Sequence, residues 1–380
     1  MYKITIIVSK LIYLIIKTLK LGSGYAWSGY IALKLYPNIL NNISKVLPKH
    51  IILISGTNGK TTLAKITAHI LEKKGFKVLY NKTGGNLING IVSTVLLESN
   101  LKGSIEKDFV IFEIDELALP ILIKHIKPEI IALLNLSRDQ LDRYWEVDLL
   151  VQRWKESFST LDKETKVLLY KNQDEFRDLI DSAKNVALFF DDDPSNLNRT
   201  SLMGTHNAVN LNCALSILGE FGIKADEATN LLSDFDYAYG RGEEIVYKEK
   251  EFLLLLAKNP ASFNNNINLL LENKFDFDTV LFILNDNIPD GKDVSWIYDI
   301  DPIPLKKVTD NKKVYITGTR ALDMSVRLSY AGIKNMMFSD DKKKIVSSIT
   351  ANVGCRKIVV LPNYSSMLQL RKIIKGRSIL

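Results

Sequence analysis

The sequence predicts an α/β fold in two parts, a larger domain built on a parallel sheet and a smaller α/β domain after it. Three observations support this fold class. From residue 51 onward, short apolar runs alternate with helical stretches, and a glycine-rich turn joins the first run to a helix. The chain has 380 residues, more than one ordinary domain holds, and its 46% hydrophobic and 24% charged residues are typical of globular proteins.

The first part of the chain, residues 1–45, is expected to be an amphipathic helix with a lead-in segment. Lys3, Lys10 and Lys17 recur every seven residues and therefore share one face of the helix. Lys10 interrupts the apolar stretch, which excludes a signal peptide or a spanning helix. Two interpretations remain open: the helix packs on its own domain, or it lies in a membrane interface. We expect a cytoplasmic protein, to which the second interpretation adds peripheral contact with the inner face of the membrane.

Residues 46–238 are expected to form the central domain and residues 239–380 the second one. In the central domain the sequence predicts a helix at 60–74, a helical pair at 206–234, and strands at 51–55, 77–80, 109–114, 130–136, 167–170 and 186–190. In the second domain the alternation restarts, with apolar runs at 251–258, 279–286, 313–318 and 357–362. Such runs are typical of parallel strands covered by helices on both faces.

The strongest functional signal is the segment SGTNGKTT at residues 55–62. It follows a strand and opens a helix, which is the setting of a phosphate-binding loop. Exposed N–H groups and the helix dipole favour an anion there. The general pattern G-x-x-x-x-G-K-[ST] would need a glycine at Ile54, so the loop has the shorter form G-x-x-G-K-T. The predicted nucleotide-binding residues of the loop are Gly56, Thr57, Asn58, Gly59, Lys60, Thr61 and Thr62.

Within this loop, Lys60 would contact the β- and γ-phosphates of a nucleotide, and Thr61 would bind Mg²⁺ through its hydroxyl. Magnesium needs further oxygen ligands, and Glu113 ends a predicted strand at the sheet edge that also carries the loop. We therefore predict Glu113 as the second metal ligand. The alternative is that Glu113 caps the next helix, a role for which Asp115 and Glu116 are better placed.

A third strand end carries the cluster Asp139, Asp142 and Arg143. It is either part of the site or an acidic and basic surface turn. The net charge of +7 fits phosphate-bearing partners or an anionic membrane, but it is mild and spread along the chain, so no nucleic-acid partner is expected.

These motifs together resemble the Mur ligase superfamily, and most closely its members that serve as the ligase subunit of lipid II isoglutaminyl synthase. The resemblance extends over most of the chain. The motifs that carry it are GSGYAWSGYIALKLYPNIL, NKTGGNLINGIVST, FEIDE, NLSRDQLDRY, GTHNAVNLNCAL, YGRGEE, LLAKNPASFN, NDNIPDGKDVSW, TGTRALDMSVRLSYAG and LPNYSSMLQLR. It implies a Mur-ligase-type P-loop domain with a parallel sheet, followed by a smaller Rossmann-like α/β domain.

The resemblance also implies an activity, namely ATP-dependent amidation of the D-glutamate α-carboxylate in the stem peptide of lipid II. An acyl phosphate would form first, and ammonia would convert it to D-isoglutamine during peptidoglycan synthesis. Lys60, Mg²⁺ and Arg241 would neutralise the charge that develops. His206 and Asn207 would contact the nucleotide, although both could simply cap a helix. Lys258 and Asn259 would face its ribose and phosphates.

The source of the ammonia is expected to be another protein. A glutaminase needs a cysteine nucleophile with a histidine base; Cys213 looks like a core residue, and Cys355 has no histidine near it in sequence. The resemblance therefore implies a class I glutamine amidotransferase partner, a GatD-like subunit, bound to the second domain. It assigns Asp293 to complete the partner's Cys–His pair, with Asp290 and Asp286 as substitutes. A turn and helix cap is the alternative for Asp293.

The sequence departs from the family pattern in two ways. Two cysteines cannot form the four-cysteine zinc ribbon of many relatives, so no zinc is expected. The phosphate loop begins at residue 55, which leaves no room before it for a domain that binds a UDP-linked sugar. Two other functions remain open: an autonomous amino-acid ligase of the Mur or folylpolyglutamate type, and an ATP-binding scaffold without catalysis that anchors a partner at the membrane.

Overall fold

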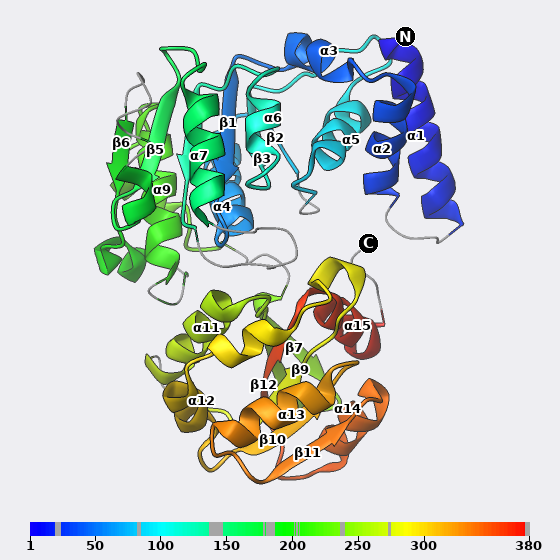
Figure 1. The fold of residues 1–380 in the computed structure, drawn as a ribbon, viewed down its shortest axis with the longest axis vertical. Coiled ribbons are helices and arrows are strands. Elements are labelled where there is room, and N and C mark those ends of the chain that lie inside the picture. The colour runs from blue at the N-terminus through cyan, green and yellow to red at the C-terminus, as the bar shows by residue number, and fades with distance from the viewer. Residues whose placement is uncertain are drawn as a thin grey trace. The chain divides into compact units, whose positions relative to one another are not determined.

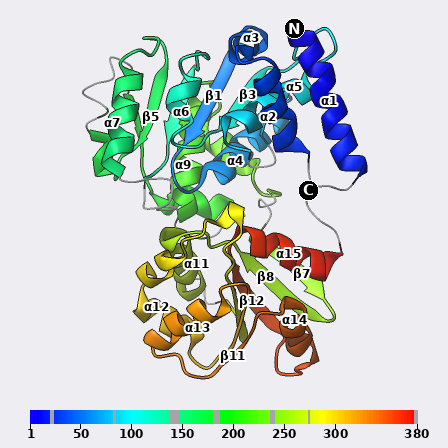
Figure 2. The ribbon, with the colours of Figure 1, turned by 45° about the vertical axis from the view of Figure 1, so that its right-hand side comes forward.

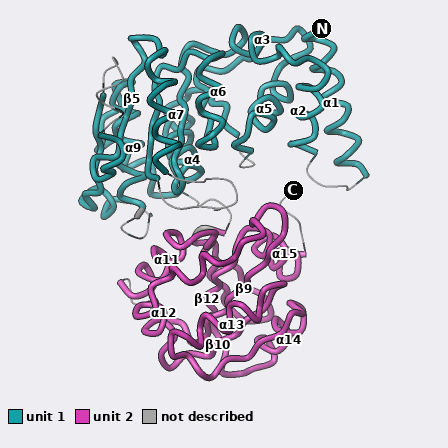
Figure 3. Tube along the Cα trace, viewed as in Figure 1, with its two compact units in different colours: residues 1–137, 146–235, 380 teal, residues 138–145, 236–379 magenta. Residues whose placement is uncertain are grey.

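The computed structural model describes residues 1–19, 24–81, 85–136, 147–177, 187–200, 206–235, 240–272 and 275–376, together with Leu179, Leu202 and Gly204. The side chains of His206 and Arg241 lie outside this description. The described residues divide into two compact units, coloured separately in Figure 3. The first contains those from Met1 to Phe235 and the second those from Gly240 to Gly376.

The first unit is built on a six-stranded sheet of order β2-β3-β1-β4-β5-β6, in which all neighbours are parallel (Figure 1). Its strands are β1 (His50–Ser55), β2 (Val78–Tyr80), β3 (Phe109–Glu113), β4 (Ile130–Leu133), β5 (Lys166–Tyr170) and β6 (Ala187–Phe190). β1 lies between β3 and β4, so the chain leaves it in one direction and returns on its other side. The carboxyl end of such a strand is where α/β sheets bind ligands.

Helices cover this sheet on both faces. One face of the sheet, which includes Ile51 and Leu53, shares a core with the helices that contain Val95, Leu119 and Trp154. The alternate residues point to the other face, where α4 and α9 pack against each other and against the strands. The helical segments of the unit are α1 (Tyr2–Thr18), α2 (Tyr25–Leu35), α3 (Ile39–Val46), α4 (Lys60–Lys73), α5 (Ile88–Glu98), α6 (Leu119–Leu122), α7 (Val147–Phe158), α9 (His206–Gly219), α10 (Ala225–Asn230) and the 3₁₀ turns η1 (Asp174–Phe176) and η2 (Pro194–Arg199).

The second unit has its own six-stranded sheet of order β11-β10-β9-β12-β8-β7. Its strands are β7 (Arg241–Tyr247), β8 (Lys250–Leu255), β9 (Thr279–Ile283), β10 (Lys313–Thr317), β11 (Met336–Ser339) and β12 (Lys357–Pro362). Its helical segments are α11 (Pro260–Glu272), η3 (Ile288–Asp290), η4 (Ser295–Asp299), α12 (Pro302–Thr309), α13 (Ala321–Tyr330), α14 (Lys342–Ala351) and α15 (Tyr364–Lys375). The core on one side of this sheet contains side chains of α14 and α15.

The predicted α/β fold class is confirmed, with one addition in the second sheet. β7 pairs antiparallel with β8, whereas the other pairings of this sheet are parallel. The two strands are joined by a tight turn in which Lys248 and Glu249 have positive φ angles of 46° and 60°. A two-residue hairpin turn of this kind usually carries Asn-Gly or Asp-Gly, so this one has no recognisable signal in the sequence. No helix in the described parts of the chain is both long and apolar enough to cross a bilayer.

Candidate functional site

The glycine-rich loop lies at the carboxyl end of β1, as its sequence predicts, and α4 begins directly after it at Lys60. Gly56 has φ +129° and Gly59 has φ +91°, values that residues with a side chain rarely adopt. A Cβ at Gly56 would lie 2.9 Å from the backbone of Asn135, and one at Gly59 would lie 2.1 Å from Asn210 Oδ1. Both glycines are therefore required by dihedral angle and by space.

Asn135, which follows β4, holds the loop in place. Its Oδ1 accepts a hydrogen bond from Asn58 N–H at 3.0 Å, its Nδ2 donates to Asn58 O at 3.1 Å, and its backbone carbonyl accepts from Thr57 N–H at 2.7 Å. These bonds fix the loop backbone between two adjacent strands. The sequence analysis did not single out Asn135, and only its position directly after a strand end could have indicated it.

Lys60 is buried at the start of α4, with 8% of its surface exposed. Its Nζ donates to Gly56 O, which folds the side chain back over the loop, and it forms an ion pair with Glu116 Oε1 at 3.0 Å. Burial by itself would lower the pKa of Lys60, but the carboxylate of Glu116, with those of Glu113 and Asp115, outweighs it and raises this pKa above its ordinary value. The loop lysine is therefore a cation throughout the physiological pH range.

The segment that ends β3 supplies three buried carboxylates, Glu113, Asp115 and Glu116. Asp115 accepts a hydrogen bond from Leu117 N–H at 3.1 Å, as expected of a capping residue. Glu116 does not fit the cap interpretation, because its side chain reaches Lys60 instead. Its backbone carbonyl accepts from the indole Nε1 of Trp154 at 2.8 Å, which fixes this turn against α7.

Glu113 is 2% exposed and sits opposite Ile54 in the sheet register, one residue before the end of β1. Its backbone is bracketed by the Asn81 side chain, whose Oδ1 accepts from Glu113 N–H at 2.9 Å and whose Nδ2 donates to Glu113 O at 2.8 Å. Its carboxylate and the Thr61 hydroxyl are oxygen donors of the kind that Mg²⁺ prefers. No group of three or more His, Cys, Asp or Glu side chains within the described ranges is arranged to hold a metal by itself, so phosphate and water oxygens would complete any coordination shell.

The start of α9 adjoins the loop. Asn210, one turn into this helix, lies against Gly59 and donates through Nδ2 to Asn207 Oδ1 at 3.0 Å. Both asparagines are buried. The predicted nucleotide contact Asn207 is therefore part of a polar layer beside the loop. His206 opens the helix, and its side chain lies outside the described residues, as do Arg241's side chain and the cluster Asp139, Asp142 and Arg143.

In the second unit, Lys258 and Asn259 form the turn between β8 and α11. The Asn259 side chain is 1% exposed and accepts from Ser262 N–H at 2.8 Å, while the Ser262 hydroxyl accepts from the backbone N–H groups of both predicted residues. Asn259 thus caps α11.

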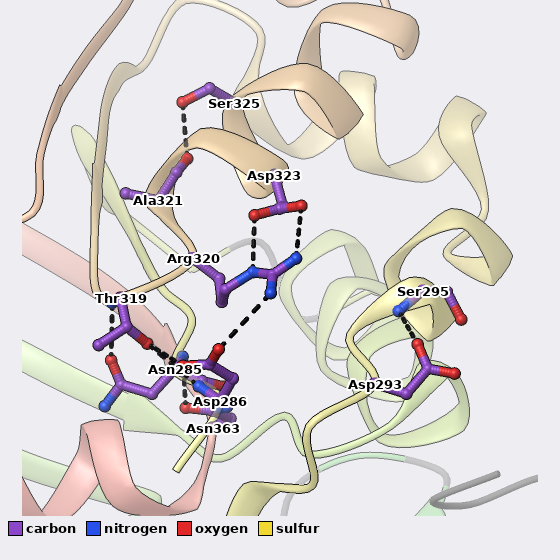
Figure 4. A network of polar contacts seen from close by, with 10 residues as sticks. All are labelled: Asn285, Asp286, Asp293, Ser295, Thr319, Arg320, Ala321, Asp323, Ser325 and Asn363. Atoms are coloured by element: carbon purple, nitrogen blue, oxygen red, sulfur yellow. Dashed lines mark hydrogen bonds and ion pairs between the residues drawn. The ribbon is translucent and has the colours of Figure 1, made fainter. Parts of the chain in front are cut away.

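Three aspartates follow β9, and the structure gives each of them a different setting. Asp286 accepts from the Thr319 hydroxyl at 2.7 Å and lies 3.5 Å from Arg320, which also forms a two-pronged pair with Asp323 (Figure 4). Asp290 is buried and accepts from Ser365, and burial raises the pKa of Asp290 despite these bonds.

Asp293 is exposed and accepts from Ser295 N–H at 2.7 Å, the geometry of a cap on η4. The hydrogen bond to Ser295, with a further contribution from the charge of Arg320, lowers the pKa of Asp293. Asp293 is therefore a rigidly held, ionised carboxylate at the surface of the unit, and of the three aspartates it is the most accessible to another protein.

Both cysteines are fully buried, Cys213 in α9 and Cys355 before β12. Burial raises the pKa of the Cys213 thiol well above its ordinary value. The Cys355 sulfur lies 3.7 Å from the hydroxyl of Tyr315 within the second core. Neither thiol has the exposure or the thiolate character of a nucleophile.

Comparison with known proteins places both units in one context. Two protein-family models match the chain, the Mur ligase middle domain over residues 54–221 and the MurT ligase C-terminal domain over residues 256–367. The MurT subunit of lipid II isoglutaminyl synthase (glutamine-hydrolyzing) from Staphylococcus aureus strain COL is 26% identical, with 89% of this chain and 90% of that protein covered. The corresponding subunit from Streptococcus pneumoniae is 24% identical, with 95% and 94% covered.

Solved structures show the same fold. The MurF ligase of Thermotoga maritima in complex with ADP superposes with a TM-score of 0.68 at 13% identity, covering 90% of this chain and 82% of that one. At this identity the likeness concerns the fold alone.

Proposed function

This chain belongs to the Mur ligase superfamily and to its MurT-type branch, and on that premise we propose that it is the ligase subunit of a lipid II isoglutaminyl synthase. The chain is an ATP-dependent ligase. Its proposed substrate is the D-glutamate α-carboxylate of the lipid II stem peptide, and its product is D-isoglutamine in peptidoglycan precursors. The observation that carries the proposal is the buried Lys60 in a rigid glycine loop at the carboxyl end of β1, in a chain that matches MurT over both units.

The chemistry required is activation of a poor electrophile. A carboxylate oxygen attacks the γ-phosphorus of ATP, the bond to the bridging oxygen breaks, and ADP leaves an acyl phosphate. Ammonia then attacks the carbonyl carbon, loses a proton and displaces phosphate. In our proposal Lys60 and Arg241 neutralise the charge between donor and acceptor, while the loop N–H groups, His206 and Asn207 position the nucleotide. Thr61 and Glu113 would hold Mg²⁺, which supplies charge neutralisation at the phosphates.

Lys60 must exchange partners for this chemistry. In the structure its ammonium contacts Glu116 and the loop carbonyl of Gly56. A nucleotide phosphate offers a stronger, multiply charged partner, so binding would draw the ammonium from the carboxylate to the phosphate. Lys258 and Asn259 are proposed to contact the ribose and phosphates from the second unit.

A separate subunit would supply the ammonia, because both cysteines of this chain are buried in cores. We propose a class I glutamine amidotransferase, which docks on the second unit so that Asp293 orients the histidine of its Cys–His pair. An apolar stripe in this unit supports protein docking: Leu322, Val326 and Tyr330 are 64%, 46% and 76% exposed and recur every four residues along α13. The ring of Tyr298 lies 6.3 Å from that of Tyr330. Exposed apolar stripes of this kind mark interaction surfaces.

The test is reconstitution of the two proteins with lipid II, glutamine, ATP and magnesium, followed by mass spectrometry of the lipid. We expect the carboxylate-to-amide mass change together with stoichiometric release of ADP. Lys60→Met should abolish the reaction with either nitrogen source. An unchanged lipid mass and no ADP release from the wild-type pair would refute the proposal.

The role of Asp293 separates the two half-reactions. Asp293→Asn should abolish turnover with glutamine and retain turnover with ammonium salts. Asp341→Asn is the matched control, since Asp341 is another exposed aspartate that caps a helix of the same unit. Equal loss with both nitrogen sources in Asp293→Asn would show that this carboxylate is structural. Ligation of an amino acid by the isolated chain would support the autonomous ligase, and ATP binding without any turnover would support the scaffold.

A further inference from the structure

The first helix, α1, presents an apolar face to solvent. Ile4, Ile7, Leu11, Leu14 and Ile15 are 60%, 46%, 52%, 56% and 52% exposed. Their spacing of three and four residues places them on one side of the helix. We call these five residues the α1 stripe. A surface helix of a globular domain ordinarily has the opposite arrangement, with its apolar stripe buried and its polar side outward.

Specific contacts hold α1 in this orientation. The side that faces the unit buries Thr5, Ile6 and Ser9, two of them polar. The hydroxyl of Ser9 donates to the backbone carbonyl of Ser28 in α2 at 3.4 Å, and Lys10 Nζ donates to the carbonyl of Leu97 in α5 at 2.9 Å. Because a small polar side is packed inward while the large aliphatic side chains point outward, burial within the unit does not explain the α1 stripe.

The neighbouring helix α2 adds aromatic side chains. α1 and α2 lie side by side (Figure 2), and Trp27 and Tyr30 of α2 are 59% and 45% exposed, with their rings in an edge-to-face pair at 5.9 Å. Tryptophan and tyrosine are enriched where proteins meet the headgroup region of a bilayer, because each ring has an apolar body and a polar tip.

The charge of this region has one sign. The first acidic residue of the chain is Glu72, and nine lysines precede it. Lys3 and Lys17 are exposed on α1 beside the stripe, and Lys17 and Lys34 place their ammonium groups 5.6 Å from the rings of Tyr13 and Tyr30. Long cationic side chains that flank an apolar stripe can keep their charge at the headgroups while the stripe enters the acyl boundary.

We propose that the α1 stripe and its flanking lysines bind the surface of an anionic phospholipid bilayer, with α1 parallel to the membrane plane. A second copy of the chain would bring lysines against lysines with no carboxylate to pair them. Lysine is also depleted from protein–protein interfaces, whereas anionic lipid headgroups attract it. The proposal does not depend on the ligase activity; if that activity is as proposed, membrane binding brings the enzyme to a lipid-linked substrate.

The experiment measures sedimentation of the full-length chain with vesicles, without nucleotide or lipid II. We expect binding to vesicles of phosphatidylcholine and phosphatidylglycerol in equal parts, and much weaker binding to phosphatidylcholine alone. The double variant Leu11→Gln/Leu14→Gln should lose at least about tenfold in affinity, because two large apolar side chains no longer enter the membrane. Lys3→Gln/Lys17→Gln should weaken binding to anionic vesicles only, and added salt should reproduce its effect.

The matched control is Leu149→Gln/Phe189→Gln, which changes two side chains of similar exposure, 50% and 51%, elsewhere in the same unit. It should bind vesicles like the wild type, and circular dichroism verifies the fold of every variant. Failure of the wild type to bind anionic vesicles, or equal binding by the α1 variant and the control, overturns the proposal. So does a change from dimer to monomer, or loss of a protein partner, in an α1 variant whose wild type ignores vesicles. None of these outcomes depends on ligase turnover.

Discussion

Replacing Glu116 by glutamine tests the ion pair that holds the loop lysine. The substitution keeps the size and shape of the side chain and removes its charge. Lys60 is then left as a buried cation, 8% exposed, whose remaining acidic neighbours are Glu113 and Asp115. Because burial alone lowers the pKa of Lys60 and Glu116 is the largest influence that raises it, the variant should also have a lysine that loses its proton at lower pH.

The magnitude follows from the geometry. Two unit charges 3.0 Å apart attract by about 5 kcal/mol at an effective dielectric constant of about 20, and removing one partner of a buried pair typically destabilises a protein by about 3–5 kcal/mol. The amide oxygen introduced by Glu116→Gln can still accept a hydrogen bond from the ammonium, and two carboxylates remain nearby. We therefore expect the lower end of this range, a loss of about 3 kcal/mol in the free energy of unfolding of the nucleotide-free protein.

The assay is urea unfolding with and without magnesium and a non-hydrolysable ATP analogue. In the wild type, nucleotide must displace Glu116 from Lys60, whereas in Glu116→Gln no carboxylate competes at this position. The analogue should therefore stabilise the variant by more than it stabilises the wild type, even though the variant is less stable without it. Measured above neutral pH, this stabilisation should decline earlier in the variant, because its lysine becomes neutral sooner.

The double variant Lys60→Met/Glu116→Gln is the control, since it removes both charges and leaves an apolar side chain in the loop. It should recover most of the lost stability and should no longer bind nucleotide, which gives a coupling energy between the two sites. The reasoning is refuted if Glu116→Gln unfolds at the same urea concentration as the wild type, or if the double variant is no more stable than the single one.

Three further substitutions test the site and the second unit. Gly59→Ala should cost about 2 kcal/mol of stability and abolish nucleotide binding by calorimetry, because of the positive φ and the collision with Asn210; full binding would contradict the required glycine. Asn135→Ala removes two hydrogen bonds to the loop, so we expect about 2 kcal/mol less stability and a higher KM for ATP in steady-state kinetics; an unchanged KM would show that the loop holds itself. The raised pKa of Asp290 means that the folded state binds its proton more tightly, so its contribution to stability is present at low pH and is lost as pH rises through the raised value. Wild type minus Asp290→Asn in unfolding free energy should therefore fall with pH from the ordinary aspartate range upward, and a difference that rises would refute the burial argument.

The parallel strands of both units could be predicted because their apolar runs are continuous and end in recognisable turns. The predicted strand at 109–114 is β3 at Phe109–Glu113, and the predicted helix at 60–74 is α4 at Lys60–Lys73. The antiparallel β7 was missed, since its turn uses Lys248 and Glu249 at positive φ instead of glycine. The short strand β11 was missed as well, because Met336 and Phe338 do not form a β-branched run.

The site was predictable where local sequence determines geometry and unpredictable where distant segments meet. The loop from Gly56 to Thr62 follows from its own motif, and Asp115 caps the turn after β3 as expected. Glu116 was assigned to the same capping role because it is adjacent in sequence. Only the fold shows that its side chain reaches across to Lys60, 56 residues away.

Asn81 lies just beyond the last residue of β2, yet its side-chain amide gives Glu113 the donor and acceptor that a neighbouring backbone would have given. The ladder between β2 and β3 is in effect prolonged by a side chain that imitates a peptide group. The backbone of β2 can stop while the last residue of β3 keeps its alignment. Aspartate at position 81 would set a carboxylate oxygen against the Glu113 carbonyl, and leucine would offer neither partner, so the sheet's margin tolerates little besides an amide there.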